Sequence, residues 1–95
     1  MSVLTTVTTT TNYSITTSDE VILVDSSGGP KTITLPGSHS MGERYHIKDK
    51  FGTTIPNTIT ISGNGNTIDG NSTFVLTVKM QGVIVLSDGS NWVLL

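Results

Sequence analysis

The sequence predicts an all-β domain, and three features support this class. Thr, Ser, Gly, Val and Ile dominate the 95 residues, and Ala is absent. Because β-branched side chains lose χ1 freedom in a helix and fit a pleated surface, this composition favours strands. Short apolar runs with period-two alternation are separated by turn residues, and no window shows helical spacing. Together these features predict a compact antiparallel β-sandwich or β-prism-like domain of short strands.

The expected strands follow one another at short intervals. Each is a run of four to six residues that contains β-branched or other apolar side chains, and turn residues such as Gly, Asp, Asn, Ser or Pro separate most of the runs. The segments are 20–24, 31–35, 44–48, 57–61, 73–78, 82–86 and 92–95. The Asp-Gly pairs at 69–70 and 88–89 predict hairpin turns, because Gly tolerates a positive φ.

The N-terminal residues differ from the rest of the chain. Residues 3–11 are Thr-rich, contain few apolar side chains and include no turn sequence. Such a segment predicts either an extended edge strand or an arm that becomes ordered against a neighbour. A chain of 95 residues has room for one domain. We therefore divide it into an N-terminal arm or edge strand, 1–12, and a single β-domain, 13–95.

Charge and composition exclude several classes of function. Five basic and seven acidic residues give a net charge of -2, and the pI is about 5.4. Nucleic-acid-binding domains usually have a basic patch or a pI above about 9, so we expect no nucleic-acid partner. The absence of Cys removes disulfides and thiolate chemistry. No apolar run approaches the roughly 18 residues of a membrane span, and no signal-peptide pattern is present. We expect a soluble chain with no membrane insertion.

Candidate catalytic and metal-binding groups are few. His39, Glu43 and His46 are spaced as a possible metal trio, but successive strand residues point to opposite faces, so Glu43 and His46 should not converge. No nucleophile elbow of the form G-x-S-x-G occurs, and most carboxylates lie in turns, where they cap backbone N–H groups. We predict no enzyme activity, no cofactor and no metal. A hydrolase would require a carboxylate pair or a His–Ser pair meeting in a cleft.

Two sets of residues are candidates for binding. The ligand candidates are loop residues, the exposed aromatic Phe51 and the turn residues Asn64, Asn66 and Asn71. The candidates for an oligomer interface come from the apolar segments 83–86 and 92–95, whose continuous pattern is typical of strands covered on both faces. The interface residues are Val83, Val85, Trp92 and Leu94. For Trp92, packing in a core or interface is favoured over stacking on a sugar.

A family resemblance follows from the order of seven motifs. They are YSIT at 13–16, VILVD at 21–25, TITLP at 32–36, GERYHIKD at 42–49, NTITI at 57–61, NTIDG at 66–70 and VLSDGSNW at 85–92. This succession resembles a small β-domain of phage tail fibres and of fibre or capsid-associated proteins of large DNA viruses. The resemblance implies a homotrimeric module of the virion that builds or tips a fibre, or decorates a capsid. It implies no reaction.

Two functional hypotheses result. In the first, the chain is a structural virion protein that associates with itself, and with other virion proteins through the N-terminal arm. In the second, it is a receptor-binding module whose loops recognise a host cell-surface glycan. An aromatic side chain in a shallow groove would favour the second hypothesis, and smooth polar loops would favour the first.

Overall fold

The computed structural model describes residues 3–52 and 56–95, and this part of the chain forms strands without any helix. The all-β class predicted from the sequence is therefore confirmed. The strands are β1 (Thr6–Thr9), β2 (Tyr13–Ser14), β3 (Val21–Val24), β4 (Lys31–Thr34), β5 (Arg44–Asp49), β6 (Ile59–Ser62), β7 (Thr73–Leu76), β8 (Gly82–Ser87) and β9 (Trp92–Leu94).

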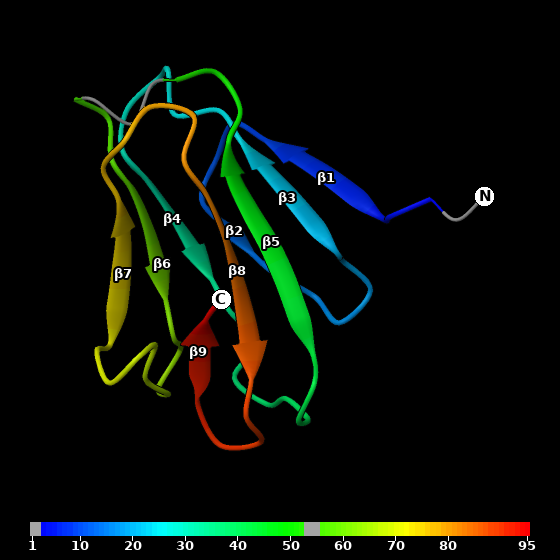
Figure 1. Cartoon of the computed structure of the whole chain (residues 1–95). Coiled ribbons are helices and arrows are strands. Elements are labelled where there is room, and N and C mark those ends of the chain that lie inside the picture. The colour runs from blue at the N-terminus through cyan, green and yellow to red at the C-terminus, as the bar shows by residue number, and fades with distance from the viewer. Residues whose placement is uncertain (1–2, 53–55) are drawn as a thin grey trace.

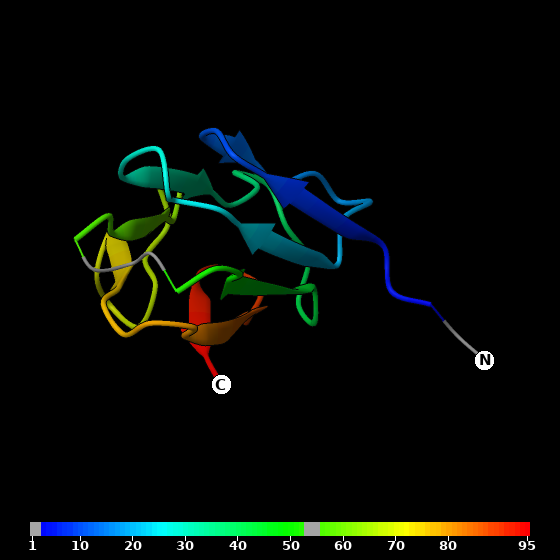
Figure 2. The ribbon, with the colours of Figure 1, turned by 90° about the horizontal axis from the view of Figure 1, so that it is seen from above.

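The strands form two sheets, and the chain alternates between them (Figure 1). The five-stranded sheet has the order β1-β3-β5-β8-β9, and the four-stranded sheet has the order β2-β4-β6-β7. Each strand from β2 to β6 lies in the opposite sheet from its predecessor, as the view from above also shows (Figure 2). The chain therefore winds around a common interior before β7, β8 and β9 complete the two sheets.

This winding makes the early strand pairs parallel. The parallel pairs are β1–β3, β3–β5, β2–β4 and β4–β6, whereas β5–β8, β6–β7 and β8–β9 are antiparallel. The expectation of an antiparallel domain was wrong for the first six strands. The turn at 25–30 carries the chain from β3 to β4 in the other sheet. Parallel neighbours require such a crossover, and here a strand of the opposite sheet supplies it.

The core forms where the inward faces of both sheets meet. Strand alternation places Ile22 of β3, Ile47 of β5 and Ile61 of β6 in this interior, and all three are fully buried. They belong to a single cluster of buried apolar side chains drawn from both sheets. The exposed surface of the chain is 5029 Å². A compact monomer of 10.0 kDa exposes about 5,200 Å². One copy of the chain therefore already forms an ordinary closed core.

The backbone conformation of the β6–β7 connection requires particular residues at two turns. Asp69 and Gly70 have φ values of 47° and 85°, and Ile68 and Asn71 exchange two backbone hydrogen bonds across them. Paired positive φ angles are typical of a type I′ turn, so the hairpin predicted at 69–70 is confirmed. The turn predicted at 88–89 also connects two antiparallel strands, β8 and β9. Gly63 has no room for a side chain, because a Cβ there would lie 2.0 Å from the carbonyl oxygen of Asn66.

The connections gather at two opposite ends of the molecule. The upper end in Figure 1 contains the connections that leave β3, β5 and β7. The lower end contains the connections that leave β2, β4, β6 and β8. Strands β3 and β5 run from the lower end to the upper end, and β8 returns antiparallel to β5.

Candidate functional site

The outer face of the five-stranded sheet carries partly exposed aliphatic side chains. The strand register aligns Val21 of β3 with His46 of β5, and His46 with Ile84 of β8. The next row aligns Leu23 with Lys48, and Lys48 with Gly82. The aliphatic residues of this outer face are Val21, Leu23, Ile84, Leu86 and Val93.

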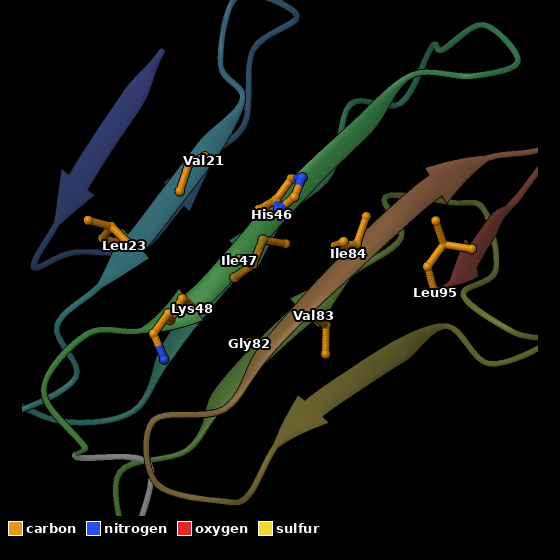
Figure 3. Close-up of a pocket in the computed structure, with 9 residues that line it drawn as sticks. All are labelled: Val21, Leu23, His46, Ile47, Lys48, Gly82, Val83, Ile84 and Leu95. Atoms are coloured by element: carbon orange, nitrogen blue, oxygen red, sulfur yellow. The ribbon is translucent and has the colours of Figure 1, made fainter. Parts of the chain in front are cut away.

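A shallow groove of about 300 Å³ crosses this outer face (Figure 3). Its lining includes Val21 and Leu23 on one side and Ile84 and Leu95 on the other. Gly82 contributes no side chain opposite Lys48, which leaves the sheet open at that position. The Lys48 ammonium donates a hydrogen bond to the carbonyl oxygen of Met80, so its charge lies at the margin of the groove. The groove is suited to an apolar contact rather than to chemistry.

The outer face of the four-stranded sheet has a different character. Alternation on β4 and β6 turns the hydroxyl side chains outward, because Ile33, Ile59 and Ile61 point into the core. The outward residues on β4, β6 and β7 are Thr32, Thr34, Thr60, Ser62, Thr73 and Val75. Apolar surface is thus concentrated on one of the two sheets, and this asymmetry identifies the outer face of the five-stranded sheet as the candidate site.

The residues predicted for an oligomer interface lie elsewhere. Val85 and Trp92 are 0% and 1% exposed, so they belong to the core of the single chain. Val83 and Leu94 are partly buried and pack against that core. The predicted interface therefore has to be moved by one position along each strand, because the prediction selected the inward-facing residues of β8 and β9. The side chains available to a partner on these strands are their neighbours Ile84, Leu86 and Val93.

His39 and Ser87, which are distant in the sequence, are in contact at the lower end of the molecule. The His39 ring lies 4.3 Å from the Trp92 ring, centroid to centroid, and its Nδ1 is hydrogen-bonded with Ser87 Oγ. The Asn66 amide nitrogen lies 3.2 Å from His39 Nε2 and donates to the Gly37 carbonyl oxygen. The Gly37 carbonyl fixes the orientation of this amide, so the amide nitrogen is the donor toward Nε2 and Nδ1 is the donor toward Ser87 Oγ.

This arrangement does not activate the serine. The proton on Nδ1 is donated to Ser87 Oγ, which is the reverse of the proton transfer that a general base performs. Ser87 is also buried, and its hydroxyl oxygen accepts a hydrogen bond from the backbone N–H of Gly89. The pair connects the 35–43 connection to the β8–β9 turn. The sequence did not reveal it, because 48 residues separate the two side chains.

The four ligand candidates do not form one site. Phe51 lies at the upper end and is 56% exposed, whereas Asn64, Asn66 and Asn71 belong to the β6–β7 connection at the lower end. Asn66 is engaged with His39, and the Asn71 amide nitrogen is 3.5 Å from the carbonyl oxygen of Asp69 in its own turn. The strands between the two ends separate Phe51 from the asparagines.

The three residues considered as a possible metal trio, His39, Glu43 and His46, are also dispersed. His46 lines the groove on the outer face, and His39 stacks on Trp92. The Glu43 carboxylate accepts hydrogen bonds from the Tyr45 hydroxyl and the Ser40 N–H, both at 3.1 Å. Within residues 3–52 and 56–95, no three His, Cys, Asp or Glu side chains are grouped as metal ligands.

Carboxylates at the turns serve local structure. The side-chain hydrogen bond with Ser27 lowers the pKa of Asp25, and the backbone N–H of Asn91 lowers the pKa of Asp88. The hydrogen bond that the Tyr13 hydroxyl donates to Asp19, 2.7 Å long, raises the pKa of Tyr13. Each acid thus accepts hydrogen bonds within or beside its own turn, which is the expected role of Asp in such positions.

Tyr45 should make the stability of the fold depend on alkaline pH. Burial, with help from the hydrogen bond to Glu43, raises the pKa of Tyr45 from 10.0 to about 12. In the unfolded chain the phenol loses its proton near pH 10.0, while in the folded chain it stays neutral. The free energy of unfolding should therefore fall as the pH rises from 10 toward about 12. Urea unfolding at several pH values measures this slope.

The matched control for this slope is Tyr45→Phe. Because the pKa of Tyr13 is also raised, the protein with Tyr45 and the Tyr45→Phe variant should both also carry Tyr13→Phe. In that background the slope attributed to Tyr45 should disappear on substitution with Phe. An unchanged slope would show that another group is responsible.

Comparison with known proteins adds no assignment. A scan of protein-family models and a search of curated proteins find no match to this chain. Among the described residues, no helix has the length and apolar character needed to cross a membrane.

Proposed function

We propose that the chain is a structural module of a virus particle, part of a fibre, tail tip or capsid decoration, and that it assembles as a homotrimer. Two independent arguments support this proposal. The order of the seven sequence motifs resembles the viral β-domain described above. The aliphatic outer face of the five-stranded sheet, which contrasts with the hydroxyl-rich face of the other sheet, offers a surface for a second copy. This asymmetry is the observation that carries the proposal.

The size of the outer face indicates what else the contact must include. With strands about 4.8 Å apart and a rise of about 3.3 Å per residue, the face covers roughly 300–400 Å². A standard interface buries about 800 Å² on each partner, so the sheet face alone provides about half of the required area. Val3 and Leu4 are exposed and precede β1, the edge strand of the five-stranded sheet. The N-terminal segment of the chain extends away from the two sheets (Figure 2). Exchange of these N-terminal residues between copies would supply additional apolar contact.

The oligomeric state is tested by light scattering on a sizing column. The wild-type chain should elute at about three times its mass of 10.0 kDa and keep that mass on dilution. Ile84→Glu should yield a folded monomer, because a carboxylate at the centre of the outer face cannot be buried without a partner. Thr60→Glu, on the outward face of the four-stranded sheet, is the matched control and should remain trimeric. A wild-type monomer at all concentrations would overturn the proposal.

Of the four candidates of the glycan-receptor hypothesis, Phe51 is the aromatic one. Phe51 is exposed at the upper end, where the Lys50 ammonium lies 5.3 Å from the centre of its ring. An aromatic ring beside a cation can face an anionic sugar, and a glycan array with wild type and Phe51→Ser tests this role. Specific binding that is lost in the variant would favour a receptor-binding module.

A further inference from the structure

The charged residues of the chain are segregated between its two ends. The upper end holds all four lysines, Lys31, Lys48, Lys50 and Lys79, with two acids, Asp25 and Asp49. The lower end holds Arg44 with five acids, Asp19, Glu20, Glu43, Asp69 and Asp88. The upper end is thus positively charged within a chain whose net charge is -2.

The charges at one end of the molecule have little electrostatic influence at the other end. Strand β5, with six residues, extends from Arg44 at the lower end to Asp49 at the upper end. A strand of that length spans about 20 Å. The Debye length at physiological ionic strength is about 8 Å. An anionic surface near the lysines is therefore largely screened from the acids of the lower end.

Buried Asp49 joins the two loops of the upper end. Its carboxylate, which is fully buried, accepts hydrogen bonds from the backbone N–H groups of Phe51, Gly52 and Met80, at 3.3, 3.1 and 3.0 Å. One acid of the upper end is thus enclosed, and its role is to hold the start of the β5–β6 connection against the β7–β8 connection. The lysines on these loops, Lys50 and Lys79, are exposed to solvent.

The same two loops expose apolar side chains. Phe51, Val78 and Met80 are 56%, 59% and 49% exposed. Met80 has a φ of 65°, a left-handed conformation that a side chain of this kind rarely adopts. Its N–H is held by Asp49 and its carbonyl oxygen by Lys48. The fold therefore maintains an unfavourable backbone conformation at a residue whose apolar side chain faces water, which points to a functional contact there.

We propose that the upper end adsorbs to anionic lipid membranes. In this contact the lysines lie against the headgroups, and Phe51, Val78 and Met80 enter the boundary between headgroups and acyl chains. The strength of binding to a membrane surface depends on the apolar area that is buried and on the electrostatic attraction to anionic lipid. An anionic polysaccharide would engage the lysines and one aromatic ring but would leave Val78 and Met80 in water. The three apolar residues and the exposed lysines Lys50 and Lys79 lie outside the groove lining, so self-association and lipid binding are compatible.

Vesicle co-sedimentation of the full chain tests the proposal. We expect at least tenfold tighter binding to phosphatidylcholine vesicles containing about 30% phosphatidylserine than to vesicles of phosphatidylcholine alone. Lys50→Glu with Lys79→Glu should weaken binding at least tenfold, because each lysine near an anionic surface contributes about fivefold. Phe51→Ser with Met80→Asn should weaken it about tenfold, and Asn is chosen because it tolerates the left-handed backbone.

Matched controls separate a specific effect from a folding defect. Met41→Ser removes a methionine of the lower end that is also exposed, and its binding should equal that of wild type. Thermal unfolding of every variant verifies the fold. Equal binding to both vesicle types, or no measurable binding of the folded wild type, would overturn the proposal. Binding that depends on the lysines but not on Phe51 and Met80 would also overturn it, and heparin affinity would then identify a polyanion-binding surface.

Discussion

Replacing Asp49 with alanine is expected to lower the free energy of unfolding by about 3–5 kcal/mol. The carboxylate is fully buried at the end of β5 and accepts hydrogen bonds from Phe51, Gly52 and Met80. Hydrogen bonds to a charged group contribute about 1.5–3 kcal/mol each, although contributions that share one carboxylate do not add fully. Alanine would leave these backbone N–H groups without their acceptor. Since small domains have only about 5–15 kcal/mol of stability, this loss is severe.

Asp49→Asn distinguishes hydrogen bonding from simple filling of space. Oδ1 accepts from Phe51 and Gly52, while Oδ2 accepts from Met80. An asparagine that keeps Oδ1 would retain the first two bonds and present its amide hydrogens to the Met80 N–H. We expect its stability to lie between those of wild type and Asp49→Ala. Urea unfolding measures all three proteins, and equal stability of Asp49→Ala and wild type would show that the carboxylate does not hold the two loops.

The positions of the strands could be predicted because alternation is a local property. The segment 44–48 was expected as a strand, and β5 spans Arg44–Asp49 with Tyr45 and Ile47 facing inward. The partner of each strand is not local. A turn such as 25–30 has the same composition whether the chain reverses within a sheet or crosses to the other sheet. The parallel pairing of β3 with β5 therefore could not be derived from the turn residues.

The orientation of β8 shows why the candidate site was only partly predictable. Residues 83–86 are all apolar, so the segment contains no alternation that would identify its inward face. Its orientation follows from the pairing with β5, where Val85 lies opposite the buried Tyr45 and Ile84 lies opposite the outward His46. The neighbouring strand therefore determines which residues are available to a partner. Likewise, the His39–Ser87 contact depends on the path of the whole chain between these residues.

Trp92→Ala is expected to destabilise the chain by about 3–5 kcal/mol, a typical effect of deleting a large aromatic side chain from a core. Trp92 is almost completely buried at the start of β9, and its ring centroid lies 4.3 Å from that of His39 and 5.9 Å from that of Tyr45. Its backbone also connects to the β6–β7 connection, because its N–H donates to the Thr67 carbonyl oxygen and its own carbonyl accepts from Asp69. Alanine would open a cavity where these segments meet.

Trp92→Phe should cost much less than Trp92→Ala. The buried Nε1 of Trp92 has no hydrogen-bond partner within the described part of the chain. An unsatisfied buried donor costs about 1–3 kcal/mol, so its removal offsets part of the packing that the smaller phenyl ring loses. We expect a net loss below about 1.5 kcal/mol in urea unfolding. If Phe were as destabilising as Ala, the indole N–H would have to be hydrogen-bonded, and this contact would stabilise the fold as much as the volume of the ring does.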